Sequence, residues 1–180
     1  NSNNGVNFGG TLTPGKFGNG IALSSTYFTI PNSIGSMRDA NGNAPFSVSG
    51  WFFLNAVSTG APCFGFSDFG AQWQIYYDGG FLFLLEGATG IKSAAANSGE
   101  WHHIVATYAV DGTQTIYVNN QKYQRSNIRT LNSQSGDLRI GRNWGYYLNG
   151  KVDEVAIWRH QVLNDQEISD LYNNGNGITL

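Results

Sequence analysis

Cysteine, charge and long apolar runs are scarce in this sequence. Cys63 is the only cysteine, which excludes an intramolecular disulfide and a cysteine-based metal cluster. The 10 Lys and Arg residues form no basic run and do not outnumber the 12 Asp and Glu, which argues against the clustered cations that bind phosphates. Apolar stretches such as 51–54 and 81–85 are far shorter than the roughly 20 residues of a membrane helix. We therefore expect no nucleic-acid partner and no membrane span.

Glycine and apolar side chains are abundant instead. The 24 glycines, together with many Asn and Ser, supply the positive φ angles that tight turns need. With 41% hydrophobic and 12% charged residues, the chain has ample material for a core and little that favours disorder. We expect a single domain over residues 1–180, because no linker is visible, and a mature or excised domain, because Asn1 opens a polar stretch.

Alternation of apolar and polar residues is the dominant pattern, and it indicates half-buried strands. In segment 46–54, Phe46, Val48, Phe52 and Leu54 share one face, which predicts a central strand. Turn residues separate the strands that follow. The predicted hairpins are 72–77 with 81–85 across Asp78–Gly80, 101–108 with 114–118 across Asp111-Gly112, and 114–118 with 121–124 across Asn119-Asn120.

The last third of the chain predicts two more strands and a helix. In strand 150–158, alternation places Val152, Glu154, Ala156 and Trp158 on one face and Asp153, Val155 and Ile157 on the other. Asn164 as N-cap and Glu167 three residues later form a capping box that starts a short helix, with Ile168, Leu171 and Tyr172 as its buried stripe. About eleven or twelve strands and one helix predict an all-β fold, a two-sheet antiparallel jelly-roll sandwich with a short C-terminal helix.

Six segments in order resemble a known family. They are 15–23 with 27–31, 46–53, 100–108, 116–120, 138–141, and the most specific one, 148–158 followed by 163–168. The chain resembles the laminin-G-like jelly-roll domains of the concanavalin A-like lectin/glucanase superfamily, although it has Asn120 where the family often has Gly. The resemblance implies a module of a secreted or surface protein that binds glycans, polysaccharides or proteins; some relatives are glycosidases or polysaccharide lyases.

Catalytic signals are missing from the sequence. A retaining glycosidase needs two carboxylates about 5 Å apart, commonly from alternate residues of one strand. No acidic pair has that spacing within a predicted strand, and the adjacent Asp153 and Glu154 point to opposite faces of a strand. His103 alternates with Trp101 and Val105, so a hydrogen-bonded core histidine is favoured over a metal ligand. We expect no enzymatic activity.

Calcium is the more credible ion, because hard oxygen ligands are plentiful and soft ligands are scarce. The resemblance implies a structural calcium where an acidic residue of the last strand meets the opening strands. Asp153 occupies the matching position, with Asn19 and Ser25 as neighbouring oxygen donors. The alternative for Asp153 is a carboxylate that accepts hydrogen bonds from turn amides.

Two loops have the chemistry of a glycan site, in which aromatic rings stack on sugars and polar groups contact the hydroxyls. The first contains Arg142, Asn143, Trp144, Tyr146 and Tyr147, and ligand contact is favoured over packing for Trp144. The second loop, 67–73, contains Asp68 and Trp73, and packing is favoured for Trp73 because it opens a strand.

The resulting hypothesis is a non-catalytic carbohydrate-binding or adhesion module, extracellular or on a cell or virion surface. The partner is a glycan or polysaccharide, or a surface protein. The alternative is a structural or protein-docking domain of an appendage, fibre or capsid decoration, which a large exposed hydrophobic patch would favour. A glycoside hydrolase or polysaccharide lyase is the third hypothesis, which an acidic pair in a cleft would revive.

Overall fold

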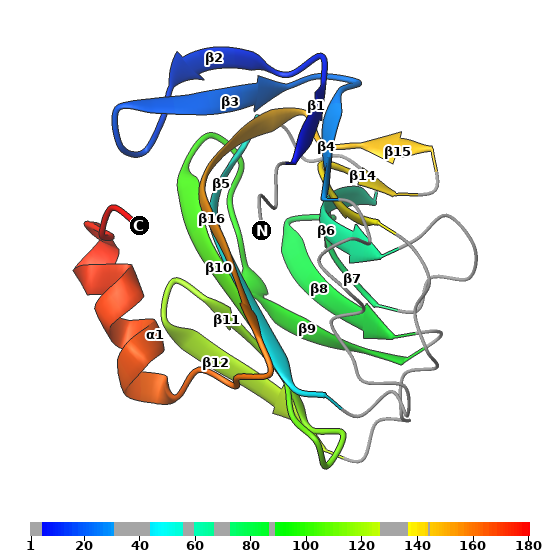
Figure 1. Ribbon diagram of the computed structural model, residues 1–180, viewed down its shortest axis with the longest axis vertical. Coiled ribbons are helices and arrows are strands. Elements are labelled where there is room, and N and C mark those ends of the chain that lie inside the picture. The colour runs from blue at the N-terminus through cyan, green and yellow to red at the C-terminus, as the bar shows by residue number, and fades with distance from the viewer. Residues whose placement is uncertain are drawn as a thin grey trace.

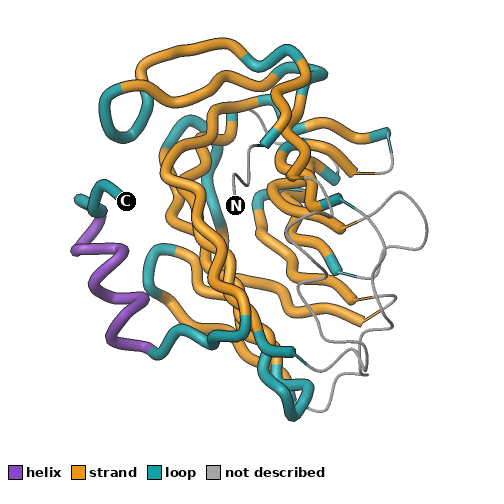
Figure 2. The backbone as a smooth tube through the Cα atoms, viewed as in Figure 1, coloured by secondary structure: helices purple, strands orange, loops and turns teal. Residues whose placement is uncertain are grey.

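The structure, a computed structural model, is a β-sandwich. It describes residues 5–30, 44–55, 60–66, 73–86, 89–126, 137–143 and 145–180. Two seven-stranded antiparallel sheets pack face to face, and a helix covers one side of the pair (Figures 1 and 2). The predicted jelly-roll sandwich with a short C-terminal helix is confirmed. None of the helices in these segments is long and apolar enough to cross a membrane.

Each sheet mixes strands from distant parts of the sequence. Sheet A has the order β1 (Val6–Phe8), β4 (Tyr27–Ile30), β13 (Leu138–Ile140), β6 (Ala61–Phe66), β7 (Gln74–Asp78), β8 (Phe81–Glu86), β9 (Thr89–Ala95). Sheet B has the order β12 (Gln121–Arg125), β11 (Gln114–Val118), β10 (Trp101–Tyr108), β5 (Phe46–Leu54), β16 (Gly150–Arg159), β3 (Asn19–Leu23), β2 (Thr11–Pro14). β14 (Arg142–Asn143) and β15 (Tyr146–Tyr147) form a separate hairpin, and α1 (Asp165–Tyr172) is followed by a 3-10 turn (Asn173–Gly175).

The turn residues act as predicted. Gly79 and Gly80 join β7 to β8 with φ of 56° and 86°, and Asn119 and Asn120 join β11 to β12 with φ of 50° and 66°. Positive φ at both central positions matches the right-handed twist of a two-residue hairpin. All three predicted hairpins are confirmed.

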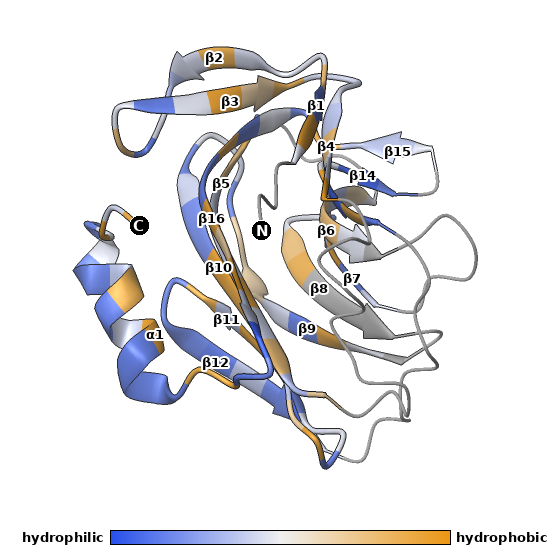
Figure 3. Ribbon diagram, in the orientation of Figure 1, coloured by the Kyte–Doolittle hydropathy of each residue, from blue (hydrophilic) through white to orange (hydrophobic). Residues whose placement is uncertain are grey.

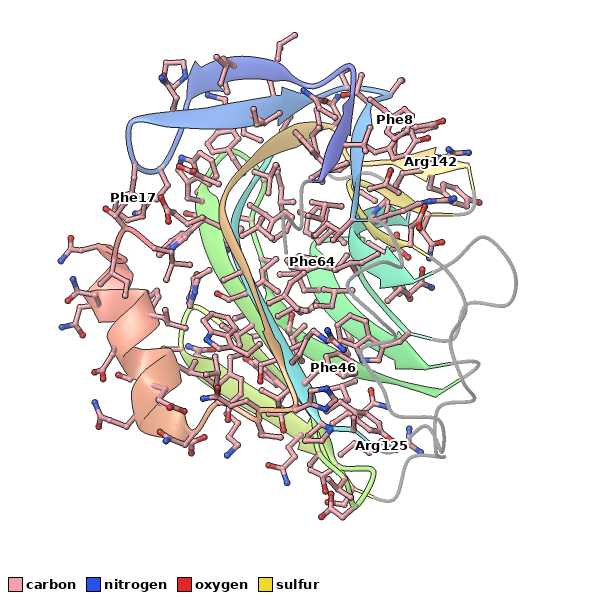
Figure 4. All side chains as sticks on the ribbon, in the orientation of Figure 1. Phe8, Phe17, Phe46, Phe64, Arg125 and Arg142 are labelled. Atoms are coloured by element: carbon pink, nitrogen blue, oxygen red, sulfur yellow. The ribbon has the colours of Figure 1, made fainter. Side chains whose placement is uncertain are left out.

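The main core lies between the sheets. Phe46, Val48, Phe52 and Leu54 of β5 are at most 1% exposed, as the alternation predicts. Phe64 of sheet A packs edge-on against Phe52, with ring centroids 5.0 Å apart. Figure 4 shows Phe46 and Phe64 in the interior between the sheets.

A β-bulge in β16 changes which side chains face the core. The register against β5 shifts between Asp153 and Ala156, and Glu154 has φ of 45°. An extra residue on one strand reverses the side-chain alternation beyond it. Val152 therefore lies in the main core, whereas Trp158 packs against the cluster beneath α1. The prediction that these two share a face is wrong.

Helix α1 begins at the predicted capping box. The Asn164 side chain accepts from the amides of Gln166 and Glu167, and the Glu167 carboxylate accepts from the Asn164 amide at 2.7 Å. The exposed side of α1 is hydrophilic (Figure 3). A second buried cluster under the helix joins α1 to sheet B and consists of Val105, Tyr117, Leu163, Ile168 and Leu171. The helix thus covers the outer face of sheet B.

Candidate functional site

The outer face of sheet A is the candidate site, because it carries the β14–β15 hairpin and lies on the side of the sandwich away from α1 (Figure 1). Gly141, with φ of 85°, ends β13 and directs the chain outward. A Cβ at Gly141 would lie 2.5 Å from Leu23 Cδ1, so glycine also fits the close packing there. The Leu148 amide donates to the Gly141 carbonyl at 2.8 Å and closes the base of the hairpin.

Asn143 fixes the hairpin to the sheet. Its side-chain amide donates to Gln74 Oε1, and the residue is 4% exposed. A Cβ at Gly65 would lie 3.2 Å from the Asn143 side chain, so the glycine makes room for this contact. Asn143 was predicted to contact ligand; its burial instead gives it an anchoring role.

A layer of rings surrounds Arg142. Its guanidinium lies 4.8 Å from the Tyr27 ring centroid and 5.5 Å from that of Tyr147, distances typical of cation–π contacts. Phe8 stacks on Tyr27 with centroids 4.7 Å apart and an interplanar angle of 6°. We call Phe8, Tyr27, Arg142 and Tyr147 the aromatic face. Figure 4 shows Phe8 and Arg142 on the same side of the sandwich.

Two rings at this site are exposed to solvent. Phe8 is 47% exposed in β1, and Tyr146 is 55% exposed in β15. Tyr146 pairs with Asn143 across the hairpin and lies beside Gly60, so its ring is on the opposite side of the hairpin from Tyr147. Exposed rings grouped with polar groups are characteristic of ligand-binding surfaces.

Two arginines lie at or beside the aromatic face. Arg139 of β13 lies next to it, and burial together with the nearby charge of Arg142 lowers the pKa of Arg139. Strand alternation places two described carboxylates on the outer face of sheet A: Asp137, two residues before Arg139, and Asp78, four residues along β7 from Gln74. That spacing corresponds to about 13 Å along a strand.

The remaining predicted glycan residues divide into two groups. Trp144 and Asp68 lie outside the described residues. Trp73 is fully buried and packs edge-on against Phe46 with centroids 5.2 Å apart. A buried ring presents no surface to a ligand, so the packing role favoured for Trp73 is confirmed and the alternative of a ligand contact is wrong.

The three predicted calcium donors do not all meet. Asp153 and Asn19 border the same cavity, of about 290 Å³. The Asp153 carboxylate accepts from the amides of Phe17 and Glu154, each at 2.9 Å, which is the turn-amide alternative. Because Leu23 pairs with Gly150, the strand rise places the turn containing Ser25 about 10 Å or more from Asp153. The Ser25 assignment is therefore wrong, and calcium at Asp153 stays a prediction.

His103 is a core residue, as expected. It is 2% exposed, its Nε2 lies 2.9 Å from Ser49 Oγ, and its ring lies between Trp51 and Tyr172 with centroids 5.0 and 6.0 Å away. Burial lowers its pKa to about 4. Across the described segments, no group of three His, Cys, Asp or Glu side chains could hold a metal.

The sequence analysis missed Phe8, Tyr27 and Arg139. The first two share a face because Phe8 pairs with Tyr27 when β1 and β4 align. Alternation of side chains in 6–8 and 27–30 could have indicated that each segment is a strand with two faces. It does not indicate which of the two faces is exposed to solvent.

The fold and this face together define a lectin-like β-sandwich with a partly exposed patch of rings around an arginine. Residues 23–169 match the family described as the concanavalin A-like lectin/glucanases superfamily, and the chain belongs to that family. No curated protein matches the sequence.

Solved structures with the same fold include enzymes and binding domains. Domain 4 of AbnA, an extracellular GH43 arabinanase from Geobacillus stearothermophilus solved with arabinotriose, has a TM-score of 0.71 and 19% identity, covering 92% of this chain and 86% of that one. The binding domain of Paraclostridial Mosquitocidal Protein 1 has a TM-score of 0.74 and 18% identity, covering 97% and 48%. A Trypanosoma rangeli sialidase has a TM-score of 0.67 and 18% identity over 88% of this chain, which spans 28% of the sialidase.

Proposed function

We propose that this chain is a non-catalytic carbohydrate-binding module that binds its ligand on the aromatic face. The observation that carries the proposal is the stack of Phe8 on Tyr27 beside Arg142, with the Phe8 ring 47% exposed. Flat rings contact the apolar faces of sugars, and a nearby guanidinium binds oxygens at the sugar edge.

Two structural relatives support a binding role. The arabinanase domain was solved with arabinotriose, and the mosquitocidal protein fragment is a binding domain. In both proteins the shared fold extends over more than nine-tenths of the present chain. They agree with a module that binds a glycan.

The carboxyl groups support the absence of catalysis. A glycosidase acid needs a raised pKa and a second carboxylate nearby. In the described part of the chain, the shifted carboxyl pKa values belong to Asp111 and Asp165, and both are lowered, by the Thr113 amide and by Lys122 respectively. Both residues belong to the sheet B side of the molecule. Release of sugar from any bound polysaccharide would contradict this part of the proposal.

A glycan array followed by titration calorimetry on each hit tests the function. Phe8→Ala removes the exposed ring and should weaken binding about 10-fold or more, because an aromatic contact contributes on the order of 1–2 kcal/mol. Val110→Ala is the matched control, since Val110 is 60% exposed in the turn between β10 and β11 and should leave affinity unchanged. Equal affinities of the Phe8 variant and wild type would exclude the aromatic face.

The second candidate function is protein docking, which the exposure of Val6 favours. Val6 is 45% exposed and shares the outer face of β1 with Phe8, which extends the apolar surface. If no glycan binds and the protein self-associates in sedimentation experiments, with Phe8→Ala abolishing the association, the docking function replaces glycan binding.

Calcium and location remain parts of the proposal. A structural calcium at Asp153 predicts that EDTA lowers the melting temperature and that Asp153→Asn removes this effect. An unchanged melting temperature in EDTA would remove the ion from the proposal. We propose an extracellular, cell-surface or virion-surface location, which immunodetection on intact cells or particles tests.

A further inference from the structure

The contacts of Arg142 bear on the chemical class of the glycan, an inference that rests on the proposed function. Tyr27 and Tyr147 contact the guanidinium through ring faces, and such stacking leaves the in-plane N–H groups available. Within the described segments the guanidinium has neither a hydrogen bond nor an ion pair, and its Nε is enclosed. The two terminal nitrogens are therefore the edge that a ligand can reach.

The permanent charge of Arg142 favours a negatively charged ligand. Arg139 lies close enough for the two positive charges to repel each other. Lys122 binds Asp165 on the sheet B side, and Glu100 lies beside His102, so neither of these carboxylates is a partner of Arg142. Negative charge on a ligand is the usual counterpart of a guanidinium that has no carboxylate partner in the described chain.

We propose that the glycan bound by the aromatic face is acidic, and that the two terminal nitrogens of Arg142 bind its carboxylate or sulfate while a sugar ring packs on Phe8. The planar guanidinium matches both groups, because each presents two oxygens at the spacing of a bidentate pair. The tyrosine rings hold the guanidinium in position before the ligand arrives, so little side-chain freedom is lost on binding.

An array of matched glycan pairs tests the proposal. Each acidic glycan is printed beside its neutral counterpart: sialylated with desialylated, uronate with its methyl ester, and sulfated with desulfated. Binding of acidic members supports the proposal, and the pair that responds identifies carboxylate or sulfate as the source. Binding of neutral members at equal strength overturns the proposal and leaves the proposed function intact, whereas a silent array overturns both.

Charge variants test the role of Arg142 itself. Arg142→Gln should weaken binding of the acidic hit about 10- to 100-fold, as expected for the loss of hydrogen bonds to a charged group. Arg142→Lys should retain only part of the wild-type affinity, because lysine keeps the charge but lacks the planar guanidinium. Arg125→Gln is the control; Arg125 is exposed on edge strand β12, far from Arg142 in Figure 4. Wild-type affinity in Arg142→Gln overturns the proposal.

The salt dependence of the affinity tests the proposal on wild-type protein, so the result does not depend on whether a variant folds. For wild-type protein, affinity for the acidic hit should fall several-fold between 50 and 300 mM NaCl, because added salt shortens the Debye length and screens the charge of Arg142. The melting temperature should stay nearly constant over the same range. A salt-independent affinity would mean that the charge of Arg142 does not contribute, which contradicts the proposal.

Discussion

Two stacked aromatic pairs lie on opposite sides of this sandwich and differ in what covers them. On sheet B, Trp51 stacks on Tyr172 at the end of α1 with centroids 6.1 Å apart, and Trp51 is 3% exposed. On sheet A, Phe8 stacks on Tyr27 at 4.7 Å, and Phe8 is 47% exposed. Aromatic content alone therefore does not identify a ligand surface. The C-terminal helix covers the first pair, whereas Phe8 of the second pair is about half exposed.

The largest expected effect comes from opening the covered pair. Trp51→Ala should lower the free energy of unfolding by about 3–5 kcal/mol, because it leaves a cavity among His103, Tyr172 and Phe17. Urea denaturation followed by circular dichroism measures the loss. A change below about 1 kcal/mol would mean that the rings beneath α1 do not form a core.

The second largest expected effect is a loss of folding stability in acid, caused by His103 beneath α1. The pKa of His103 is about 4 in the folded protein against 6.5 as its ordinary value, so the unfolded chain binds the proton first as pH falls. His103 therefore contributes fully above pH 6.5, and about 3 kcal/mol of stability is lost between pH 6.5 and 4.

Urea unfolding across this pH range measures that effect. His103→Gln should flatten the pH dependence, whereas His160→Gln, at an exposed position after β16, should preserve it. An equally steep profile in the His103 variant would assign the acid sensitivity to other groups.

The helix cap should contribute less. Asn164→Ala removes the acceptor for two amides at the start of α1 and should cost about 1 kcal/mol, while Asn164→Asp should retain most of the stability. Thermal unfolding of the three proteins measures the difference. A loss in the Asp variant as large as in the Ala variant would show that the side-chain oxygen is not what matters.

The smallest change in stability is expected on the open face. Phe8→Ala should change the free energy of unfolding by about 1 kcal/mol or less, since half of the ring is already in solvent. The same variant should lose glycan affinity. A stability loss comparable to that of Trp51→Ala would make Phe8 a packing residue and remove the contrast between the two faces.

Features set by a few neighbouring residues could be predicted from the sequence. Two examples are the capping box of Asn164 and Glu167 and the turn at residues 79–80. Each depends on residues a few positions apart, so a short stretch of sequence is enough to predict it. His103 could be assigned to a core because its apolar neighbours alternate with it.

Features set by distant contacts could not be predicted. The bulge at Glu154 uses a positive φ that glutamate rarely adopts, and its carboxylate accepts from the Leu180 amide at 2.7 Å, so tertiary structure holds it there. The Ser25 error has a related cause, because proximity to Asp153 depends on the register of β3 against β16.

The candidate site was predicted in part. Arg142 and Tyr147 lie in an aromatic loop between strands, which drew attention from composition alone. Phe8 and Tyr27 join them only when β1 and β4 pair at the edge of sheet A. Alternation identifies two faces of each strand but not the face that a later helix leaves open.

The hairpin of residues 142–147 leaves the scaffold at Gly141 and returns at Leu148, joined there by a single backbone hydrogen bond. Leu148 belongs to the main core, and none of the described residues in 142–147 does. If the proposed site is correct, ligand preference and core packing therefore depend largely on different residues. A library randomised at Arg142, Tyr146 and Tyr147, with Gly141, Asn143 and Leu148 kept, should yield binders of altered preference on an unchanged framework.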